Sequence, residues 1–245
     1  MQITGIIGNH RKEERTSGQE QSPRKQDSWT GLPTAIVADL GANAQEYIEQ
    51  EKQRQCPPPE SCPGCQARGS LVGHGYYPRK PKDKERAYWM WVKRWKCKVC
   101  GHTCSSLPSF LLAHRHYVVE AIHAALSARC EEEQSWAEVK VSCAKAGTPA
   151  VRTMQRWCQS FAKQAPGWLG PVQQTLAVQD SGSPWLDAHG EAPKASNPAQ
   201  ALLQAAVHLL AWAKTQWAEL VGYGWNDRLR LLWLWGANRG LGRLV

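Results

Sequence analysis

Two pairs of cysteines in this sequence share the spacing C-x2-C. "CPGC" supplies Cys62 and Cys65, "CKVC" supplies Cys97 and Cys100, and 31 residues separate the pairs. Each C-x2-C can bring two sulfurs to one ion on a tight turn, and four thiolates suit the tetrahedral coordination of Zn²⁺. Four thiolates leave no position open for water. We therefore predict one Zn²⁺ with a structural rather than a catalytic role.

Other uses of these cysteines remain open. A redox C-x2-C normally lies near a βαβ unit, and no such pattern is nearby. The chain has nine cysteines, an odd number that argues against a closed disulfide framework. Gly64 and Gly101, inside or just after the pairs, permit the turns. The two pairs already fill the coordination shell of one ion. Four further residues are alternative ligands: Cys56, Cys104, His74 and His102.

A small β-structure is expected to position the two pairs. Residues 56–110 are punctuated by Gly and Pro, and "YWMWVKRWK" has the aromatic and β-branched content of a strand. Two C-x2-C turns joined by a short sheet make a zinc ribbon. Period-2 alternation predicts that Trp89, Trp91 and Trp95 share one face of the strand. These rings could stack on bases or fill a small core, and we favour the core.

The ribbon carries most of the excess positive charge. The chain has a net charge of +9 and a sequence pI of about 9.2. Between Cys62 and Cys100 there are ten Lys and Arg residues and only two acidic residues. This balance indicates a polyanionic partner, most often nucleic acid. The loop "PRKPKDKER" is either a solvated loop or a phosphate-binding one, and its candidate contacts are Lys80, Lys82, Lys84 and Arg86.

Residues 114–165 show helical spacing and predict three helices. The first is expected over about 117–129. The second begins at Ser135, which forms a capping box with Glu138, and ends at Gly147. The third follows Thr148 and Pro149 as cap and first residue, and ends before Pro166.

This order of helix, glycine-containing turn and helix is the helix-turn-helix layout. In the third helix Val151, Met154, Trp157, Cys158 and Phe161 form one apolar stripe. The opposite side is polar. Arg and Gln can read guanine and adenine edges in the major groove, so we predict contacts with double-stranded DNA. A plain packing domain is the alternative. The candidate DNA-binding residues are Arg152, Thr153, Gln155 and Arg156.

Residues 56–165 resemble a known arrangement. The segments "CPGC…GHGYYPR…RWKCKVCGHTCSSLPSFL" and "VRTMQRWCQSF" are similar to the zinc ribbon plus helix-turn-helix at the start of bacterial insertion-sequence transposases. They look still closer to small transposon-associated proteins that carry those two modules alone. The resemblance implies DNA binding, with Arg152 and Arg156 as candidate contacts. Its implied metal ligands are Cys62, Cys65, Cys97 and Cys100.

A complete transposase would also need an RNase H-like nuclease with three metal-binding carboxylates. The roughly 80 residues after 165 are largely helical, and their acids do not follow apolar strands. We therefore expect a DNA-binding protein of a mobile element, not an enzyme, that recognises element ends or regulates transcription. The alternative is a partial or divergent transposase that cuts DNA with a partner subunit. An RNA-binding ribbon fits the charge but not the recognition helix.

The fold class expected is α+β, mostly α. Residues 1–33 are expected to be a disordered tail, 34–55 a short strand and helix, and 166–196 a linker. The segment 197–245 should be helical, with Asn197 as N-cap and Gly222 at the C-terminal end. Its apolar stripe either forms a homodimeric coiled coil or packs against the chain's own tail, which we favour.

The chain shows neither a signal peptide nor a stretch of about 20 apolar residues. A cytoplasmic, nucleoid-associated protein is therefore expected, with no membrane contact. A transposase is another partner to expect.

Overall fold

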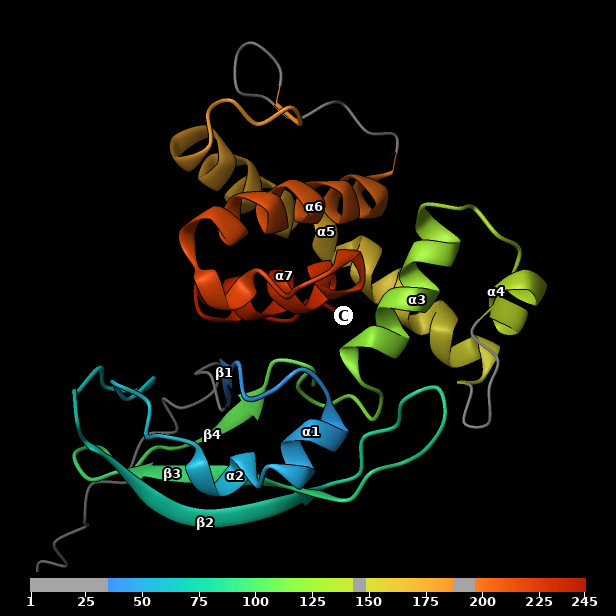
Figure 1. Ribbon diagram of the computed structural model, residues 1–245. Helices are drawn as coiled ribbons and strands as arrows, with labels where there is room; N and C mark the ends of the chain where they lie inside the picture. Colours follow the sequence, from blue (N-terminus) through green and yellow to red (C-terminus); the bar gives the residue numbers. More distant parts are fainter. Residues whose placement is uncertain (1–34, 143–148, 187–196) are drawn as a thin grey trace, which may run out of the picture. The chain divides into compact units, whose positions relative to one another are not determined.

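The computed structural model describes residues 35–142, 149–186 and 197–245 (Figure 1). These ranges combine one four-stranded sheet with a larger helical part, which confirms the α+β class. The predicted tail at 1–33, and the helix-end residues Gly147 and Thr148, lie outside the described residues. None of the described helices combines the length and hydrophobicity needed to span a bilayer.

The sheet comprises β1 (Ala35–Ala38), β2 (Leu71–Arg79), β3 (Met90–Cys97) and β4 (Thr103–Pro108). Its strand order is β1-β4-β3-β2. β2 and β3 form an antiparallel hairpin, β4 pairs antiparallel with β3, and β1 pairs parallel with β4. Two short helices, α1 (Ala44–Glu49) and α2 (Lys52–Gln55), follow β1. The sequence predicted a strand and one helix over 34–55.

The favoured core role of the three tryptophans is wrong for two of them. Trp95 is buried, whereas Trp89 and Trp91 are exposed. The register slips between Gly73 and Tyr76 of β2, where three residue steps oppose two on β3. The extra residue belongs to β2, and such a bulge locally twists and bends the hairpin. Glycine at position 75, with φ 79°, suits this bulge.

The helical part begins directly after the sheet. α3 spans Val119–Cys130, close to the first predicted helix, and α4 spans Trp136–Ser142. α5 is the longest helix, Val151–Gln179. It is followed by α6 (Pro198–Gln216), the short 3-10 turns Ala218–Leu220 and Trp225–Asp227, and α7 (Arg228–Ala237).

Two predicted helix caps are confirmed. Ser135 N–H donates to Glu138 Oε2 over 2.7 Å, and Glu138 N–H donates to Ser135 Oγ over 3.4 Å, which is the reciprocal capping box. Asn197 Oδ1 accepts from the backbone N–H groups of Ala199 and Gln200 at the start of α6. These caps satisfy backbone donors that have no partner within the helix.

Three predicted helix boundaries are wrong. α5 starts after Ala150, so Pro149 precedes the helix, and α6 ends at Gln216 rather than near Gly222. α5 also continues through Pro166 and Pro171, across the first half of the predicted linker. The structure offers a physical reason for that continuation. Both prolines lie on the exposed or half-exposed side of α5, whose opposite side is buried. Water can therefore hydrate the backbone carbonyls that lose their hydrogen bond at each proline.

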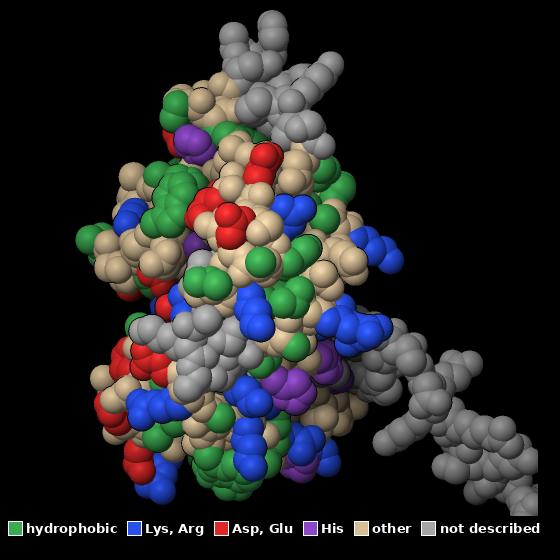
Figure 2. Space-filling model, turned by 90° about the vertical axis from the view of Figure 1, so that its right-hand side faces the viewer, with side chains coloured by type: hydrophobic (Ala, Val, Ile, Leu, Met, Phe, Trp, Pro, Cys, Tyr) green, Lys and Arg blue, Asp and Glu red, His purple; other side chains and the backbone are tan. Residues whose placement is uncertain are grey.

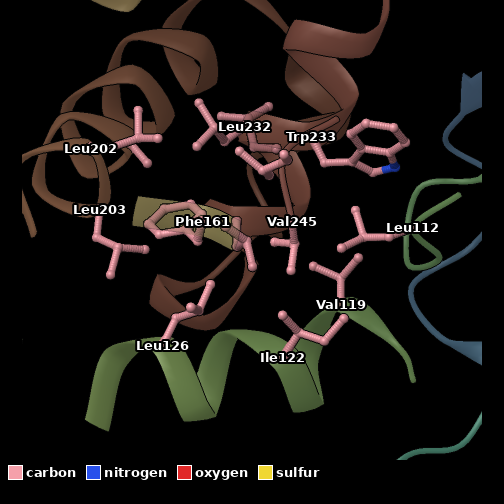
Figure 3. Close-up of a cluster of buried hydrophobic side chains, with 14 of the residues drawn as sticks. Leu112, Val119, Ile122, Leu126, Phe161, Leu202, Leu203, Leu232, Trp233 and Val245 are labelled. Atoms are coloured by element: carbon pink, nitrogen blue, oxygen red, sulfur yellow. The ribbon is translucent and has the colours of Figure 1, made fainter. Parts of the chain in front are cut away.

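One hydrophobic core joins α3, α5, α6 and α7, and it includes Val37 of β1, Met90 of β3 and Leu107 of β4. Figure 3 shows Ile122 of α3, Phe161 of α5, Leu202 of α6 and Leu232 of α7 converging on one interior. The apolar stripe of α6 therefore packs against the chain's own tail, as favoured from the sequence. The helices at 119–161 and the C-terminal segment form a common core and are not separate packing units.

Two buried arginines of α7 link distant parts of the chain. Arg230 donates to Ser109 Oγ over 2.8 Å and to the Gly41 carbonyl over 2.7 Å, and it forms an ion pair with Asp39. These contacts fasten α7 to the loop after β1 and to the end of β4. A buried charge is tolerated only when it is paired and hydrogen-bonded, and Arg230 meets both conditions.

The second arginine, Arg228, is fully buried beside α3. It donates to His123 Nε2 over 2.8 Å and forms an ion pair with Glu131. His123 must be neutral to accept this bond. Burial and the nearby Arg228 guanidinium lower the pKa of His123 to about 3.

Gly236 lets α5 and α7 approach closely, so its substitution tests their packing. A Cβ at position 236 would lie 2.0 Å from a ring carbon of buried Trp168. We expect Gly236→Ala to lower the free energy of unfolding by about 1–3 kcal/mol, because the ring must shift. Urea unfolding measures this. Gly170→Ala is the control, since nothing lies within 4 Å of that position. An equal or smaller loss for Gly236→Ala would contradict the packing.

The lowered pKa of the buried His123 predicts that stability depends on pH. Its pKa is about 3 in the fold and about 6.5 in the unfolded chain, so the unfolded chain binds more protons between these values. The stabilisation is present above about pH 6.5 and is lost as the pH falls toward 3. At pH 5.5 the loss should be about 1.4 kcal/mol. His123→Gln keeps a neutral acceptor for Arg228 and should remove this loss.

Urea unfolding of the metal-loaded protein at pH 5.5 and 7.5 measures this difference. His74→Gln, at an exposed position, serves as the matched control. An unchanged pH dependence in His123→Gln would show that this buried histidine is not its source.

Candidate metal centre and nucleic-acid interface

Two short turns present the cysteine pairs to each other. Before β2, Gly64 N–H points to Cys62 Sγ at 3.3 Å; after β3, Val99 N–H points to Cys97 Sγ at 3.4 Å. The residue after each pair has a positive φ, 61° at Gln66 and 76° at Gly101. The sequence therefore identified the turn glycine correctly at Gly101. In the first turn the left-handed residue is Gln66, not Gly64.

The four sulfurs have the spacing of a tetrahedral metal site. All four lie within 4.8 Å of one another. Cys62 Sγ lies 3.7 Å from Cys100 Sγ, and Cys65 Sγ lies 3.7 Å from Cys97 Sγ. A tetrahedron with metal–sulfur bonds of about 2.3 Å has edges of about 3.8 Å. The group can thus hold one metal ion, and its four sulfurs would complete a closed coordination shell.

The electrostatics of the thiols fit a bound cation. Hydrogen bonds with Ser70 Oγ and the backbone of Cys100 lower the pKa of Cys97 to about 6. By contrast, burial raises the pKa of Cys100 to about 12, and the neighbouring thiols act in the same direction. Four packed thiols cannot all ionise without a compensating positive charge. A divalent cation supplies that charge and favours the thiolate form of each ligand.

The alternative ligands lie outside this group. Cys56 and Cys104 are buried beside it, in a small cluster with Leu71 and Trp95. Burial raises the pKa of both thiols, that of Cys104 to about 11. Among the described residues, the group of donors close enough to share an ion consists of the four C-x2-C cysteines.

The basic hairpin loop is held in place at its base. Lys82 N–H donates to the His116 carbonyl over 2.7 Å, and Val118 N–H donates to the Lys82 carbonyl over 2.9 Å. The loop therefore joins the segment that leads into α3. Lys80 and Lys82 are exposed, and Figure 2 shows Lys and Arg side chains over the lower part of one face, around a hydrophobic patch.

The tip of the loop is also ordered. Asp83 accepts from the backbone N–H groups of Glu85 and Arg86 and from Tyr88 Oη, which is 2.5 Å away. Burial acts to raise the pKa of Asp83, but these hydrogen bonds outweigh it and lower the pKa. Arg86 is exposed, whereas Lys84 is half-buried and lies 4.0 Å from Glu120. Of the four predicted loop cations, Lys84 is thus the least accessible.

The start of α5 presents the predicted polar side only in part. Arg152 and Arg156 are exposed, while Met154, Trp157, Cys158 and Phe161 are buried, as the stripe predicted. Thr153 and Gln155 are half-buried. Gln155 lines a hollow of about 620 Å³ that Arg129 and Trp136 also line. The two arginines are therefore the better placed candidates for DNA.

Sequence reasoning missed the exposed aromatic side chains of the hairpin. Tyr76, Trp89 and Trp91 lie in solvent, opposite the buried Met90 and Val92. The alternation of Trp89, Trp91 and Lys93 with these two apolar residues was the available signal. It indicates a strand with one buried face and an exposed face that carries both rings and a cation.

Comparison with known proteins adds one finding. Residues 62–157 match a family model described as a domain of unknown function (DUF6431). The matched region contains both C-x2-C pairs, the hairpin, α3, α4 and the start of α5. The comparison with curated proteins finds no match, and the comparison with solved structures finds none either.

Removal of one sulfur should empty the metal centre. We expect about one divalent ion per chain in the wild type and close to none in Cys97→Ser, because three sulfurs no longer complete the shell. Mass spectrometry of the intact protein under native conditions measures the ratio. Cys104→Ala is the control, since Cys104 is buried in the same cluster but does not belong to the ligand group.

Chelation should affect the two parts of the protein unequally. Loss of metal should change the near-ultraviolet dichroism of tryptophans in the sheet, while the far-ultraviolet helix signal persists because the helical core contains no ligand. Full retention of metal by Cys97→Ser would contradict this assignment.

Proposed function

We propose that this chain is a DNA-binding protein of a mobile genetic element. In this proposal the four cysteines bind Zn²⁺ and fold a zinc ribbon. The segment α3–α4–α5 acts as a helix-turn-helix, with the start of α5 as recognition helix. The protein would recognise element ends or regulate transcription, and it would cut no DNA itself. The all-thiolate donor set supports zinc over harder cations such as Mg²⁺ and Ca²⁺.

The observation that carries the proposal is the arrangement at the start of α5. Arg152 and Arg156 are one helical turn apart and exposed, while the intervening Met154 is fully buried. Residues four apart lie on the same side of a helix, so both guanidinium groups point from one face. An arginine near the N-terminal end of a recognition helix can form two hydrogen bonds to guanine in the major groove.

The hairpin loop supplies the second part of the proposed interface. Of its exposed cations, Lys82 and Arg86 suit phosphate contacts that fix position without reading sequence. The backbone bonds between Lys82 and residues 116–118 support a fixed relation between this loop and α3. Affinity from such contacts should fall steeply with salt.

Substitution of Arg156 separates sequence reading from charge attraction. We expect Arg156→Ala to weaken binding to a cognate duplex by about 1–3 kcal/mol and binding to random DNA much less. Lys163→Ala is the matched control, because Lys163 is exposed on the same helix but two turns further from its N-terminal end. Fluorescence anisotropy of the zinc-loaded protein measures both, with DNA flanking its own gene as the cognate candidate.

The salt concentration must be varied in the same experiment. Specific binding to the flanking duplex should survive near-physiological salt, whereas binding by charge alone collapses on both duplexes. Equal losses in Arg156→Ala and Lys163→Ala on every sequence would overturn base reading by α5. Metal-dependent nicking of the duplex by the purified wild type would overturn the non-catalytic role.

A further inference from the structure

The exposed face of the β2–β3 hairpin carries three aromatic rings. Tyr76, Trp89 and Trp91 have exposed fractions of 41%, 51% and 44%. Tyr76 pairs with Lys93, and Pro78 pairs with Trp91, so these four side chains lie on one face of the two strands. Trp89 precedes Trp91 by two residues, and their ring centroids are 6.2 Å apart in an edge-to-face arrangement.

The opposite face of the same strands is buried. Met90 and Val92, which alternate with the exposed rings, have exposed fractions of 1% and 0%. The hairpin therefore already has its core side, and the three rings contribute little to it. Neighbouring aromatic rings left in solvent are uncommon on a protein surface and mark a binding site more often than scattered apolar residues do.

Two lysines lie directly on these rings. Lys80 Nζ is 4.4 Å from the centre of the Trp89 ring, and Lys93 Nζ is 4.4 Å from that of Tyr76. Lys93 also donates a hydrogen bond to Tyr76 Oη over 3.2 Å. The surface thus alternates flat π faces with ammonium groups on long side chains, which can turn from a ring to a nearby anion.

We propose that this face, defined by Tyr76, Trp89, Trp91, Lys80 and Lys93, binds unpaired nucleotides of single-stranded DNA. Bases stack on Trp89, Trp91 and Tyr76, and the two lysines contact the phosphates between them. In a duplex the base faces are covered by their neighbours, so this face is complementary to a strand whose bases are free. The choice of DNA rests on the proposed function.

Charge distinguishes this occupant from an apolar protein partner. An apolar protein surface would leave the ammonium groups of Lys80 and Lys93 without a counter-charge when it covered the rings. A single strand supplies both complements, a π face for each ring and a phosphate for each lysine. Base stacking on aromatic side chains is tolerant of sequence. This site would therefore bind near the duplex-reading helix without adding sequence preference of its own.

Removal of the rings tests the proposal on the full, zinc-loaded chain. The probe is a fluorescein-labelled oligothymidine of twelve nucleotides at near-physiological salt, followed by anisotropy. We expect the double variant Trp89→Ala/Trp91→Ala to bind this strand at least about tenfold more weakly than the wild type. Binding to the flanking duplex should stay within about twofold. Trp91→Tyr keeps a stacking ring and should retain most of the affinity.

Trp217→Ala is the matched control. Trp217 has an exposed fraction of 41% but lies at the end of α6, away from the hairpin in sequence. Its removal should leave binding to the single strand unchanged. Metal content and the unfolding midpoint of each variant are measured in parallel, so that a misfolded double variant is recognised. In that case the single variants Trp91→Ala and Lys93→Gln decide the question, each with an expected loss of about threefold or more.

The outcomes separate this inference from the proposed function. Single-strand binding that resists the loss of both tryptophans, or that is absent in the wild type, overturns the inference. Tighter binding to oligouridine RNA than to the DNA strand overturns the choice of DNA. Loss of duplex binding in Arg156→Ala with intact strand binding supports two separate sites. Strand binding without any specific duplex binding supports this inference and rejects the helix-turn-helix proposal.

Discussion

The four sulfurs of the C-x2-C pairs impose the strongest physical constraint on the sheet. They lie within 4.8 Å of one another, and thiolates at that distance repel unless a cation lies between them. The apolar cluster beside them is small and is composed largely of cysteines, with Leu71 and Trp95 as its larger members. Little hydrophobic burial is therefore available at this end of the sheet. A metal ion bound by the four sulfurs would therefore supply much of what fixes the register of β2, β3 and β4 there.

The other end of the sheet packs on the helices through Val37, Met90 and Leu107 of the main hydrophobic core, and polar contacts add to this packing. Arg230 binds the loop after β1 and the end of β4, and the hairpin loop hydrogen-bonds to the segment before α3. Burial of the charged Arg230 side chain costs solvation free energy. Its ion pair with Asp39 and its hydrogen bonds to Ser109 and to backbone carbonyls offset that cost. These polar contacts are directional, whereas the common core of α3, α5, α6 and α7 is not. They therefore help to fix which surface of the helices faces the sheet.

How far the sequence predicts this structure depends on the range of the interactions involved. The C-x2-C turns, the capping box at Ser135 and the cap at Asn197 each involve a few neighbouring residues, and all were predictable. The course of α5 through Pro166 was not, because burial against other helices outweighs the local cost of proline. The burial of Trp95 but not of Trp91 was not predictable either, because it depends on the small cluster that packs at one end of β3. Arg228 and Arg230 look like surface residues until α3 and the end of β4 are placed beside them.

In their proposed roles, the exposed rings and the exposed arginines make different chemical demands on a nucleic acid. A guanidinium group on α5 needs base edges, which a duplex presents in its major groove while its bases remain stacked. A tryptophan ring on the hairpin needs a base face, which becomes accessible only when stacking is lost. One site cannot meet both demands, whereas two elements of one chain can. The opened end of a duplex offers both kinds of surface within a short distance. A protein that combines the two chemistries is better suited to such an end than to uninterrupted DNA.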